Sequence, residues 1–109
     1  MARRKYNNQP TIMFGLKFDS KAEAERYLQL LSREQAGEIT ELEHHAVYRL
    51  EVNGALICNY ESDFRYRENG AIIVEDVKGG KATVTPVYKL KKKLMRAIHG
   101  IKIQEVRMR

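Results

Sequence analysis

Cysteine and long apolar runs are both scarce in this sequence of 109 residues. The single cysteine, Cys58, cannot form an internal disulfide and has no CxxC companion for a zinc site, so we expect an intracellular protein held by packing alone. The longest apolar stretches, such as residues 71–74, are far shorter than the roughly 20 residues that span a bilayer, and no apolar signal core is visible near the start. These absences predict a cytoplasmic protein with no membrane span and no secretory signal.

Acidic residues are nearly missing from the C-terminal third. Residues 78–109 carry ten Lys/Arg against Glu105 alone, a net charge of +9, whereas residues 1–77 carry ten Lys/Arg and thirteen Asp/Glu, a net charge of −3. A basic third is the pattern expected of a protein that binds a polyanion, most commonly nucleic acid. A basic face that is only solvated explains the charge equally well.

The length and composition predict one folded domain. Hydrophobic residues make up 43% of the chain and charged residues 31%, which is typical of a globular protein, and 109 residues are too few for two independent cores. We see no internal repeat and no low-complexity tract. We expect residues 1–10 to form a flexible basic arm and residues 11–109 to form the domain.

The first half of the chain predicts a helix followed by strands. Ser20 and Glu23 form the S-x-x-E pattern of a capping box, and helical spacing of apolar residues continues to Gly37, which predicts a helix over residues 20–36. Asn53 and Gly54 are a strong hairpin signal between strands over residues 45–52 and 56–67. A polar turn leads to a third strand over residues 71–78. We expect these three strands to form a meander, preceded by a short extended segment over residues 11–18.

The second half predicts a basic helix and a last strand. Thr85 is a good N-cap and Pro86 fits the first helical position. The predicted apolar stripe lies at helical spacing and the predicted helix ends at Gly100; the stripe consists of Val87, Leu90, Leu94 and Ile98. Apolar residues around 101–106 predict a short strand. The expected fold is α/β, a single compact domain of order α-β-β-β-α-β with a mixed sheet flanked by helices.

Charged residues follow the apolar part of the strand over residues 71–78. Because side chains alternate along a strand, Asp76 and Lys78 should project from one face and Glu75 from the other. Charge at the end of a buried strand pattern points to a function. A cross-strand ion pair at the wet end of the strand is an equally good explanation.

Asp63 lies between aromatic residues on the preceding strand, which suggests that it is buried. Antiparallel pairing would bring Asp63 beside Asp76, and two adjacent carboxylates repel each other unless a cation joins them. Oxygen ligands of this kind suit Mg²⁺ better than zinc. The alternative is an ion pair of Asp63 with one of three arginines, namely Arg26, Arg65 or Arg67.

The arrangement of these residues resembles the PD-(D/E)XK nuclease superfamily. The similarity covers nearly the whole chain, and the blocks SDFRY at 62–66, EDVKG at 75–79 and TPVYKLKKK at 85–93 look like those of a small nuclease-like family of phages and prophages. The resemblance implies a restriction-endonuclease-like core in which Asp63, Asp76 and Glu23 hold the metal and Lys78 is the motif lysine. The superfamily's proline before the first aspartate is Ser62 here, which departs from the pattern.

The activity that this resemblance implies is a Mg²⁺-dependent DNA endonuclease, with Mn²⁺ as a substitute. It would hydrolyse phosphodiester bonds in branched DNA such as Holliday junctions, or in duplex DNA, during phage replication or recombination in the host cytoplasm. A short chain without a separate recognition domain favours reading of DNA shape, and cutting two strands favours a homodimer. The alternatives are a noncatalytic nucleic-acid-binding protein on the same fold and a sequence-specific restriction-type nuclease.

Glu23 has two interpretations. It completes the capping box with Ser20, and it also matches the acidic residue that many superfamily members carry on the first helix. Glu23 lies at the border of the helix's apolar stripe, whereas Glu25 is rotated about 200° away toward solvent. We therefore expect Glu23, rather than Glu25, at the site.

The lysines of the second helix are candidate contacts to the DNA backbone. Lys91 matches the family block at its position after Tyr88, and three further residues would add nonspecific affinity, namely Lys89, Lys93 and Arg96. For each of these residues alone, a solvated helix face is the simpler explanation.

Two adjacent histidines and the cysteine offer a further candidate site. His44 and His45 would point to opposite faces if they lie on one strand, and no other His or Cys has ligand spacing, which argues against a transition-metal site. Cys58 has no helix N-terminus or clear base beside it, so a buried strand position is the simpler interpretation.

Overall fold

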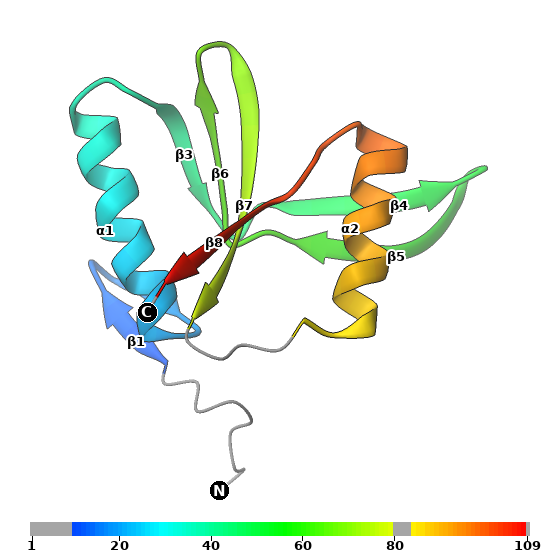
Figure 1. Ribbon diagram of the computed structural model, residues 1–109, viewed down its shortest axis with the longest axis horizontal. Helices are drawn as coiled ribbons and strands as arrows, with labels where there is room; N and C mark the ends of the chain where they lie inside the picture. Colours follow the sequence, from blue (N-terminus) through cyan, green and yellow to red (C-terminus); the bar gives the residue numbers. More distant parts are fainter. Residues whose placement is uncertain (1–9, 80–83, 109) are drawn as a thin grey trace, which may run out of the picture.

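The computed structural model describes residues 10–79 and 84–108 (Figure 1). The predicted basic arm falls mainly on residues 1–9, outside the described residues. The two helices are α1 (Lys21–Gln35) and α2 (Pro86–His99). The strands are β1 (Thr11–Met13), β2 (Leu16–Phe18), β3 (Thr40–His44), β4 (Val47–Val52), β5 (Ala55–Glu61), β6 (Phe64–Glu68), β7 (Ala71–Gly79) and β8 (Gln104–Met108).

A four-stranded mixed sheet in the order β3-β6-β7-β8 forms the centre of the fold. β7 pairs with β8 in parallel, and the other two pairings are antiparallel. β1–β2 and β4–β5 form separate two-stranded sheets. The predicted α/β class, single domain and mixed sheet with helices are confirmed, and the chain contains more strands than the expected order allowed.

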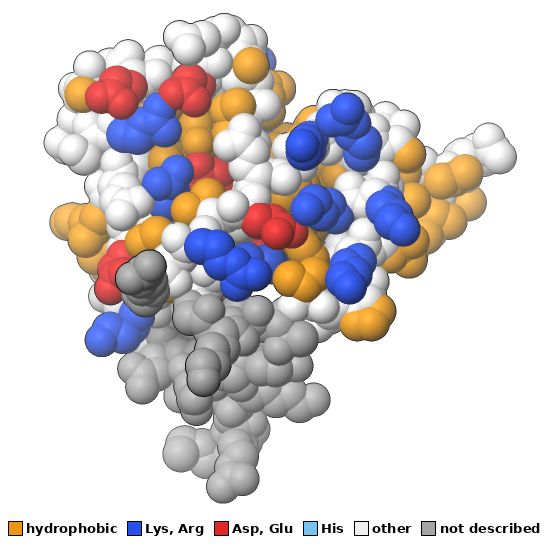
Figure 2. Space-filling model, viewed as in Figure 1, with side chains coloured by type: hydrophobic (Ala, Val, Ile, Leu, Met, Phe, Trp, Pro, Cys, Tyr) orange, Lys and Arg blue, Asp and Glu red, His pale blue; other side chains and the backbone are white. Residues whose placement is uncertain are grey.

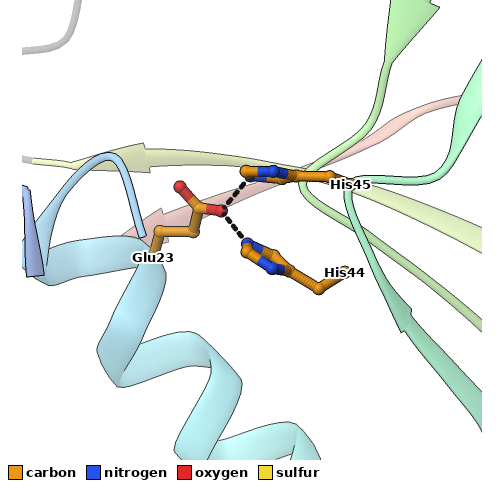
Figure 3. A group of neighbouring side chains, drawn as sticks. All are labelled: Glu23, His44 and His45. Atoms are coloured by element: carbon orange, nitrogen blue, oxygen red, sulfur yellow. Dashed lines mark hydrogen bonds and ion pairs between the residues drawn. The ribbon is translucent and has the colours of Figure 1, made fainter. Parts of the chain in front are cut away.

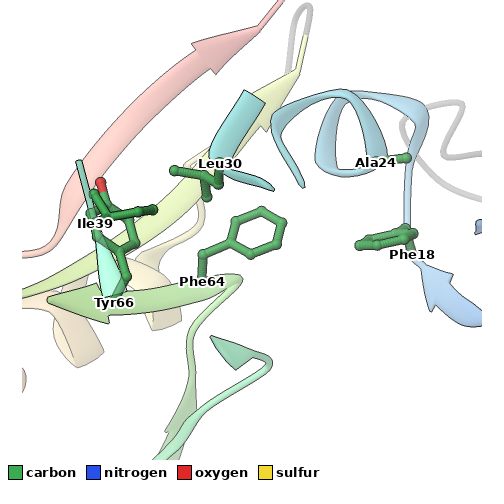
Figure 4. Packing of buried hydrophobic residues seen from close by; sticks show 6 residues of the cluster. All are labelled: Phe18, Ala24, Leu30, Ile39, Phe64 and Tyr66. Carbon is green, nitrogen blue, oxygen red and sulfur yellow. The ribbon is translucent and has the colours of Figure 1, made fainter. Parts of the chain in front are cut away.

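Each face of the central sheet has its own core. On the α1 face, the cluster of buried residues consists of Phe18, Ala24, Leu30, Ile39, Phe64 and Tyr66 (Figure 4). On the other face, Val74 of β7 packs with Met95 of α2 and with Leu50 and Tyr60 of the β4–β5 hairpin. The sheet therefore lies between α1 on one side and α2 with the hairpin on the other.

The predicted strand over residues 56–67 and the predicted meander are wrong. The strand is interrupted at Ser62 and Asp63, so that β5 pairs with β4 and β6 joins the central sheet. The segment that precedes β5 is divided in the same way: β3 ends at His44 in the central sheet, and β4 begins at Val47 in the two-stranded sheet. The expected strand over residues 45–52 therefore missed β3, which precedes it.

Hydrogen bonds join the link between β3 and β4 to the link between β5 and β6. The N–H and the hydroxyl of Ser62 both donate to the carbonyl of Ala46, each at 2.9 Å, and the N–H of His45 donates to the carbonyl of Asp63 at 3.1 Å. Ser62 is fully buried and Ala46 nearly so. We call the residues 45–46 and 62–63 the crossing. These long-range bonds are the physical reason for the interruption that the sequence pattern did not show.

Turns and caps follow the sequence signals. Asn53 and Gly54 both have positive φ, at 50° and 80°, as a tight hairpin turn requires. The Ser20 hydroxyl accepts from the N–H of Glu23 at 3.2 Å, and the Thr85 hydroxyl accepts from the N–H of Tyr88 at 3.1 Å. Both predicted helix starts are therefore confirmed. The expected extended segment over residues 11–18 is the hairpin β1–β2.

The predicted apolar stripe of α2 is correct in its second half only. Leu94 and Ile98 pack against the second core, but Val87 and Leu90 are 63% and 55% exposed. The buried face instead passes through Met95, which is fully buried. The helix is rotated because its first turn packs through Tyr88.

Candidate active site

The predicted site residues lie around the C-terminal half of β7, between the first turns of the two helices. The first turn of α1 lies very close to the end of β7, since a Cβ added at Gly79 would lie 2.7 Å from the Cβ of Ala22. Glycine at this position thus lets the start of α1, with Glu23, reach the end of β7. From the other face, the Tyr88 ring of α2 lies against Lys78.

Asp63 is a half-buried carboxyl that the backbone of β7 contacts directly. Its Oδ2 accepts a hydrogen bond from the N–H of Val77 at 2.6 Å. Burial, and next the negative charges of Asp76 and Glu23, raises the pKa of Asp63 to about 8, although the charge of Lys78 acts in the opposite direction. Asp76 and Glu23 therefore lie near enough to Asp63 for their charges to act on it.

The arginines offered as alternative partners of Asp63 are all engaged elsewhere. Arg26 pairs with Glu75, Arg65 with Glu43 and Arg67 with Glu41. Within residues 10–79 and 84–108, Asp63 has no ion pair closer than 4.0 Å. The ion-pair explanation of Asp63 is therefore wrong for these arginines.

Asp76 and Lys78 project from the same face of β7, as strand alternation predicted. Lys78 Nζ lies 2.7 Å from Asp76 Oδ1, and the Tyr60 hydroxyl donates to Asp76 Oδ2 at 2.9 Å. Burial, and next the charge of Asp76, raises the pKa of Tyr60 far above its ordinary value. Tyr60 is thus a constant hydrogen-bond donor that fixes the orientation of the Asp76 carboxylate.

Lys78 is held from two sides. It is only 8% exposed, and its Nζ lies 3.7 Å from the centroid of the Tyr88 ring, which is a cation–π contact. The Tyr88 hydroxyl donates to Glu105 of β8 at 2.9 Å. Burial, followed by the charge of Asp76, raises the pKa of Tyr88, so that the ring stays neutral under the lysine.

Glu23 is buried beneath two histidines (Figure 3). Its Oε1 lies 2.8 Å from Nε2 of His44 and 2.8 Å from Nε2 of His45, and its Oε2 accepts from the N–H of Asp19 at 3.2 Å. The carboxylate therefore bonds to groups other than the Ser20 amide that a capping box would supply. Glu25 is exposed, as expected.

The prediction that His44 and His45 point to opposite faces is wrong. β3 ends at His44, and His45 has a positive φ of 59° in the crossing, which turns its side chain to the same side. The ring centroids are only 3.6 Å apart. Both rings consequently converge on Glu23.

Glu75 occupies the opposite face of β7, where Arg26 donates two hydrogen bonds to it at 2.8 and 2.6 Å. The hydroxyl of Tyr66 donates to the same carboxylate. Hydrogen bonding to Glu75 is also the main cause that raises the pKa of Arg26. This buried pair is complete by itself and lies outside the candidate site.

Basic side chains gather over α2 (Figure 2). Three of the predicted DNA contacts are exposed, namely Lys89, Lys93 and Arg96, while Lys91 is half-buried. Lys92 pairs with Glu105 at 3.0 Å, which keeps it close to the sheet. Cys58 is half-buried on β5 against the second core, in line with a structural position.

Sequence reasoning missed the aromatic and imidazole groups that surround the carboxylates. The sequence patterns assign no role to Tyr60, and Tyr88 enters only as part of a sequence block. Alternation along β5 could have placed Tyr60 on the inner face, but its contact with Asp76 depends on how the two sheets meet.

A protein-family model described as "Protein of unknown function (DUF1064)" matches residues 3–108. The chain belongs to the DUF1064 family. None of the curated proteins and none of the solved structures compared with it matches. Within the described part of this DUF1064 protein, no helix is both long and apolar enough to cross a bilayer.

Proposed function

We propose that this DUF1064 protein is a metal-dependent DNA endonuclease with a restriction-endonuclease-like core of the PD-(D/E)XK type. The observation that carries the proposal is the grouping at the end of β7, where Lys78 Nζ lies 2.7 Å from Asp76 Oδ1 and half-buried Asp63 lies near enough that the charges of Asp76 and Glu23 help to raise its pKa. Carboxylates crowded in this way are stable in their charged form only when a cation joins them.

The donor set fits a hard divalent cation. Glu23, Asp63 and Asp76 supply three carboxyl groups, and Lys78 is the cation paired with this group. Carboxylate oxygens are the ligands that Mg²⁺ and Mn²⁺ prefer. When bound, such an ion would polarise a phosphodiester and lower the pKa of a water molecule. Mg²⁺, with Mn²⁺ as a substitute, is therefore the proposed cofactor.

The protein's own groups have separate tasks in this proposal. Lys78, held between Asp76 and the Tyr88 ring, presents an ammonium group that would orient the attacking water or stabilise the negative charge that develops on the phosphate. Tyr60 fixes the Asp76 carboxylate. Because both supporting tyrosines are neutral donors, with Tyr60 buried and Tyr88 half-buried, the geometry is formed before the substrate arrives.

The basic surface of α2 begins next to the site, since Tyr88 in its first turn contacts Lys78. In this proposal its cations contact DNA phosphates and supply affinity that does not depend on sequence; they are Lys89, Lys91, Lys93 and Arg96. Contacts of this kind support recognition of DNA shape, and hence a branched or duplex substrate. The proposed setting is phage replication or recombination in the host cytoplasm.

A homodimer is part of the same proposal, because two sites related by symmetry can cut both strands of a junction. The outer side of the β4–β5 hairpin exposes Val47 and Ile57, which are 54% and 55% exposed. Light scattering on the purified chain would show twice the monomer mass; a monomer at the concentrations used for cleavage would remove the dimer from the proposal.

A cleavage assay tests the proposal. The wild-type chain is incubated with supercoiled plasmid, linear duplex and a synthetic four-way junction, in Mg²⁺, Mn²⁺ or EDTA. We expect cutting with either metal and none in EDTA, preference for the junction, and no cutting by Asp76→Asn or Lys78→Ala. Glu25→Gln, which changes an exposed carboxylate on the same helix as Glu23, is the control and should cut normally.

Three other results would change the conclusion. Binding of these DNAs without cutting in either metal would make the protein a noncatalytic nucleic-acid-binding protein. Equal cleavage of junction and duplex would remove the preference for branched DNA. Cleavage confined to one sequence would assign a restriction-type nuclease.

A further inference from the structure

The group formed by Glu23, His44 and His45 has a donor chemistry different from that of the three carboxylates. Each of the three residues offers one ligand atom, and these atoms all lie within 4.8 Å of one another. Two imidazole nitrogens with one carboxylate oxygen are typical ligands of zinc and similar transition metals, whereas Mg²⁺ prefers oxygen. We infer that these residues form a binding site for one zinc-class dication.

The three donor atoms are already close to the spacing of a tetrahedral zinc site. Both His Nε2 atoms lie 2.8 Å from Glu23 Oε1. Ligands at about 2.0–2.1 Å from zinc in tetrahedral geometry are about 3.4 Å apart, so these two distances need to grow by roughly 0.6 Å. An ion would replace the hydrogens that now join the imidazoles to the carboxylate.

The packing fixes two of the ligands before any ion binds. The ring of His44 packs with Phe18 and Phe64 at centroid distances of 4.6 and 5.7 Å. Glu23 is held through its other oxygen by the N–H of Asp19. Both side chains are therefore unable to turn away freely, which lowers the entropy cost of binding.

A carboxylate lies near the outer nitrogen of His45. Its Nδ1 lies 3.6 Å from the Glu61 carboxylate, while its Nε2 faces Glu23. When an ion takes the place of the hydrogen on Nε2, a carboxylate near Nδ1 would favour the proton on that outer nitrogen. The His45 side chain is 26% exposed, so an ion has access from solvent.

This site shares Glu23 with the proposed nuclease site but does not depend on it. Asp76 and Lys78 belong to the other face of β7 and supply no ligand to the histidine site. The variant Asp76→Asn should therefore keep zinc binding even though it loses cleavage. Failure of one proposal leaves the other standing.

Titration of the metal-free full-length chain tests the inference. Zn²⁺ binding is measured by calorimetry, and Co²⁺ serves as a spectroscopic probe of tetrahedral nitrogen and oxygen ligation. We expect one ion per chain, and a loss of affinity of more than about 100-fold in His45→Gln, because changes to outer partners alone cost 10–100-fold. His99→Gln, which alters an exposed histidine of α2, is the matched control and should bind normally.

His44→Gln changes a packed ring, so circular dichroism and a thermal melt accompany it. If that variant does not fold, His45→Gln at the more exposed position decides the question. The inference is overturned if wild type binds Zn²⁺ no better than His45→Gln does, or if affinity falls in His99→Gln instead.

Discussion

Glu75 and Asp76 are neighbours on β7 and have opposite surroundings. Glu75, 1% exposed, receives two hydrogen bonds from Arg26 and one from Tyr66. Asp76 contacts Lys78 and Tyr60, and its charge also acts on Asp63. One carboxylate has a complete set of partners on its face, whereas the other belongs to a group in which negative charges outnumber positive ones.

The comparison separates a structural carboxylate from a candidate catalytic one. A buried ion pair with all its hydrogen bonds satisfied has no capacity for a ligand, so Glu75 stabilises the contact between α1 and the sheet. The group of Glu23, Asp63 and Asp76 has no such complete set of partners, and the pKa of Asp63 rises within it. Burial alone would not distinguish the two faces; the balance of charge does.

Replacing Asp76 or Glu75 by its amide should affect DNA cleavage differently, and the loss of cleavage in the Asp76 variant is the largest effect that we expect. Asp76→Asn should lower junction cleavage at least about 1,000-fold, or about 4 kcal/mol in activation free energy, because it removes a proposed metal ligand. Because this change also removes the charge partner of Lys78, cleavage is compared at temperatures where a thermal melt shows that the variant is folded. Glu75→Gln should keep cleavage at temperatures where it is folded. Loss of cleavage in both folded variants would contradict the assignment of a structural role to Glu75 and a catalytic role to Asp76.

The next effect is on folding. Arg26→Met should lower the free energy of unfolding by about 3 kcal/mol, because removal of one partner leaves the Glu75 charge buried without its cation. Urea denaturation measures the loss, and the double variant Arg26→Met with Glu75→Leu should recover much of it. A double variant as unstable as Arg26→Met would show that the pair acts through something other than charge.

Asp63 should destabilise the metal-free fold at high pH. Its folded pKa of about 8 lies above the ordinary value of 3.8, so the folded state holds the proton more tightly, and the stability from this group falls as pH rises from about 4 to 8. In EDTA at pH 8.5, Asp63→Asn should therefore be more stable than wild type, whose carboxylate is then charged.

The amide at position 63 can still accept from the N–H of Val77, so this variant changes the charge and keeps the hydrogen bond. Melts of both proteins in EDTA between pH 5 and 8.5 measure the difference, which should shrink toward low pH. Added Mg²⁺ should stabilise wild type more than the variant. A difference that does not vary with pH would contradict the raised pKa.

The smallest effect concerns the exposed cations of α2. Replacing Lys89, Lys93 and Arg96 by Gln should weaken DNA binding and reduce the slope of log affinity against log salt by roughly 2–3. Fluorescence anisotropy at several salt concentrations measures that slope. Arg49→Gln, an exposed cation on β4, is the control, and an equal change in both proteins would argue against α2 as the DNA contact.

Local signals in the sequence predicted much of the fold. The caps at Ser20 and Thr85, the turn at Asn53 and the alternation of Glu75 and Asp76 each depend on a few neighbouring residues, and the structure agrees with them. The same alternation put Asp76 and Lys78 together on one face. The roles of these residues in catalysis stay predictions.

The remaining features depend on contacts between distant segments. Residues 56–67 look like one strand, and only the bonds from Ser62 to Ala46 divide them. His44 and His45 converge on Glu23 because His45 adopts a positive φ, which no pattern of apolar residues reveals. Likewise, the rotation of α2 follows from the packing of Tyr88, so Val87 and Leu90 were wrongly assigned to the core.

The crossing contains His45, in the link between β3 and β4, and Asp63, in the link between β5 and β6. The N–H of His45 donates to the carbonyl of Asp63 at 3.1 Å. The β4–β5 hairpin continues directly from these residues and extends away from the central sheet (Figure 1). The hairpin also packs on α2 through Leu50 and Tyr60. The same packing that builds the second core therefore sets the positions of one proposed ligand from each site, His45 and Asp63.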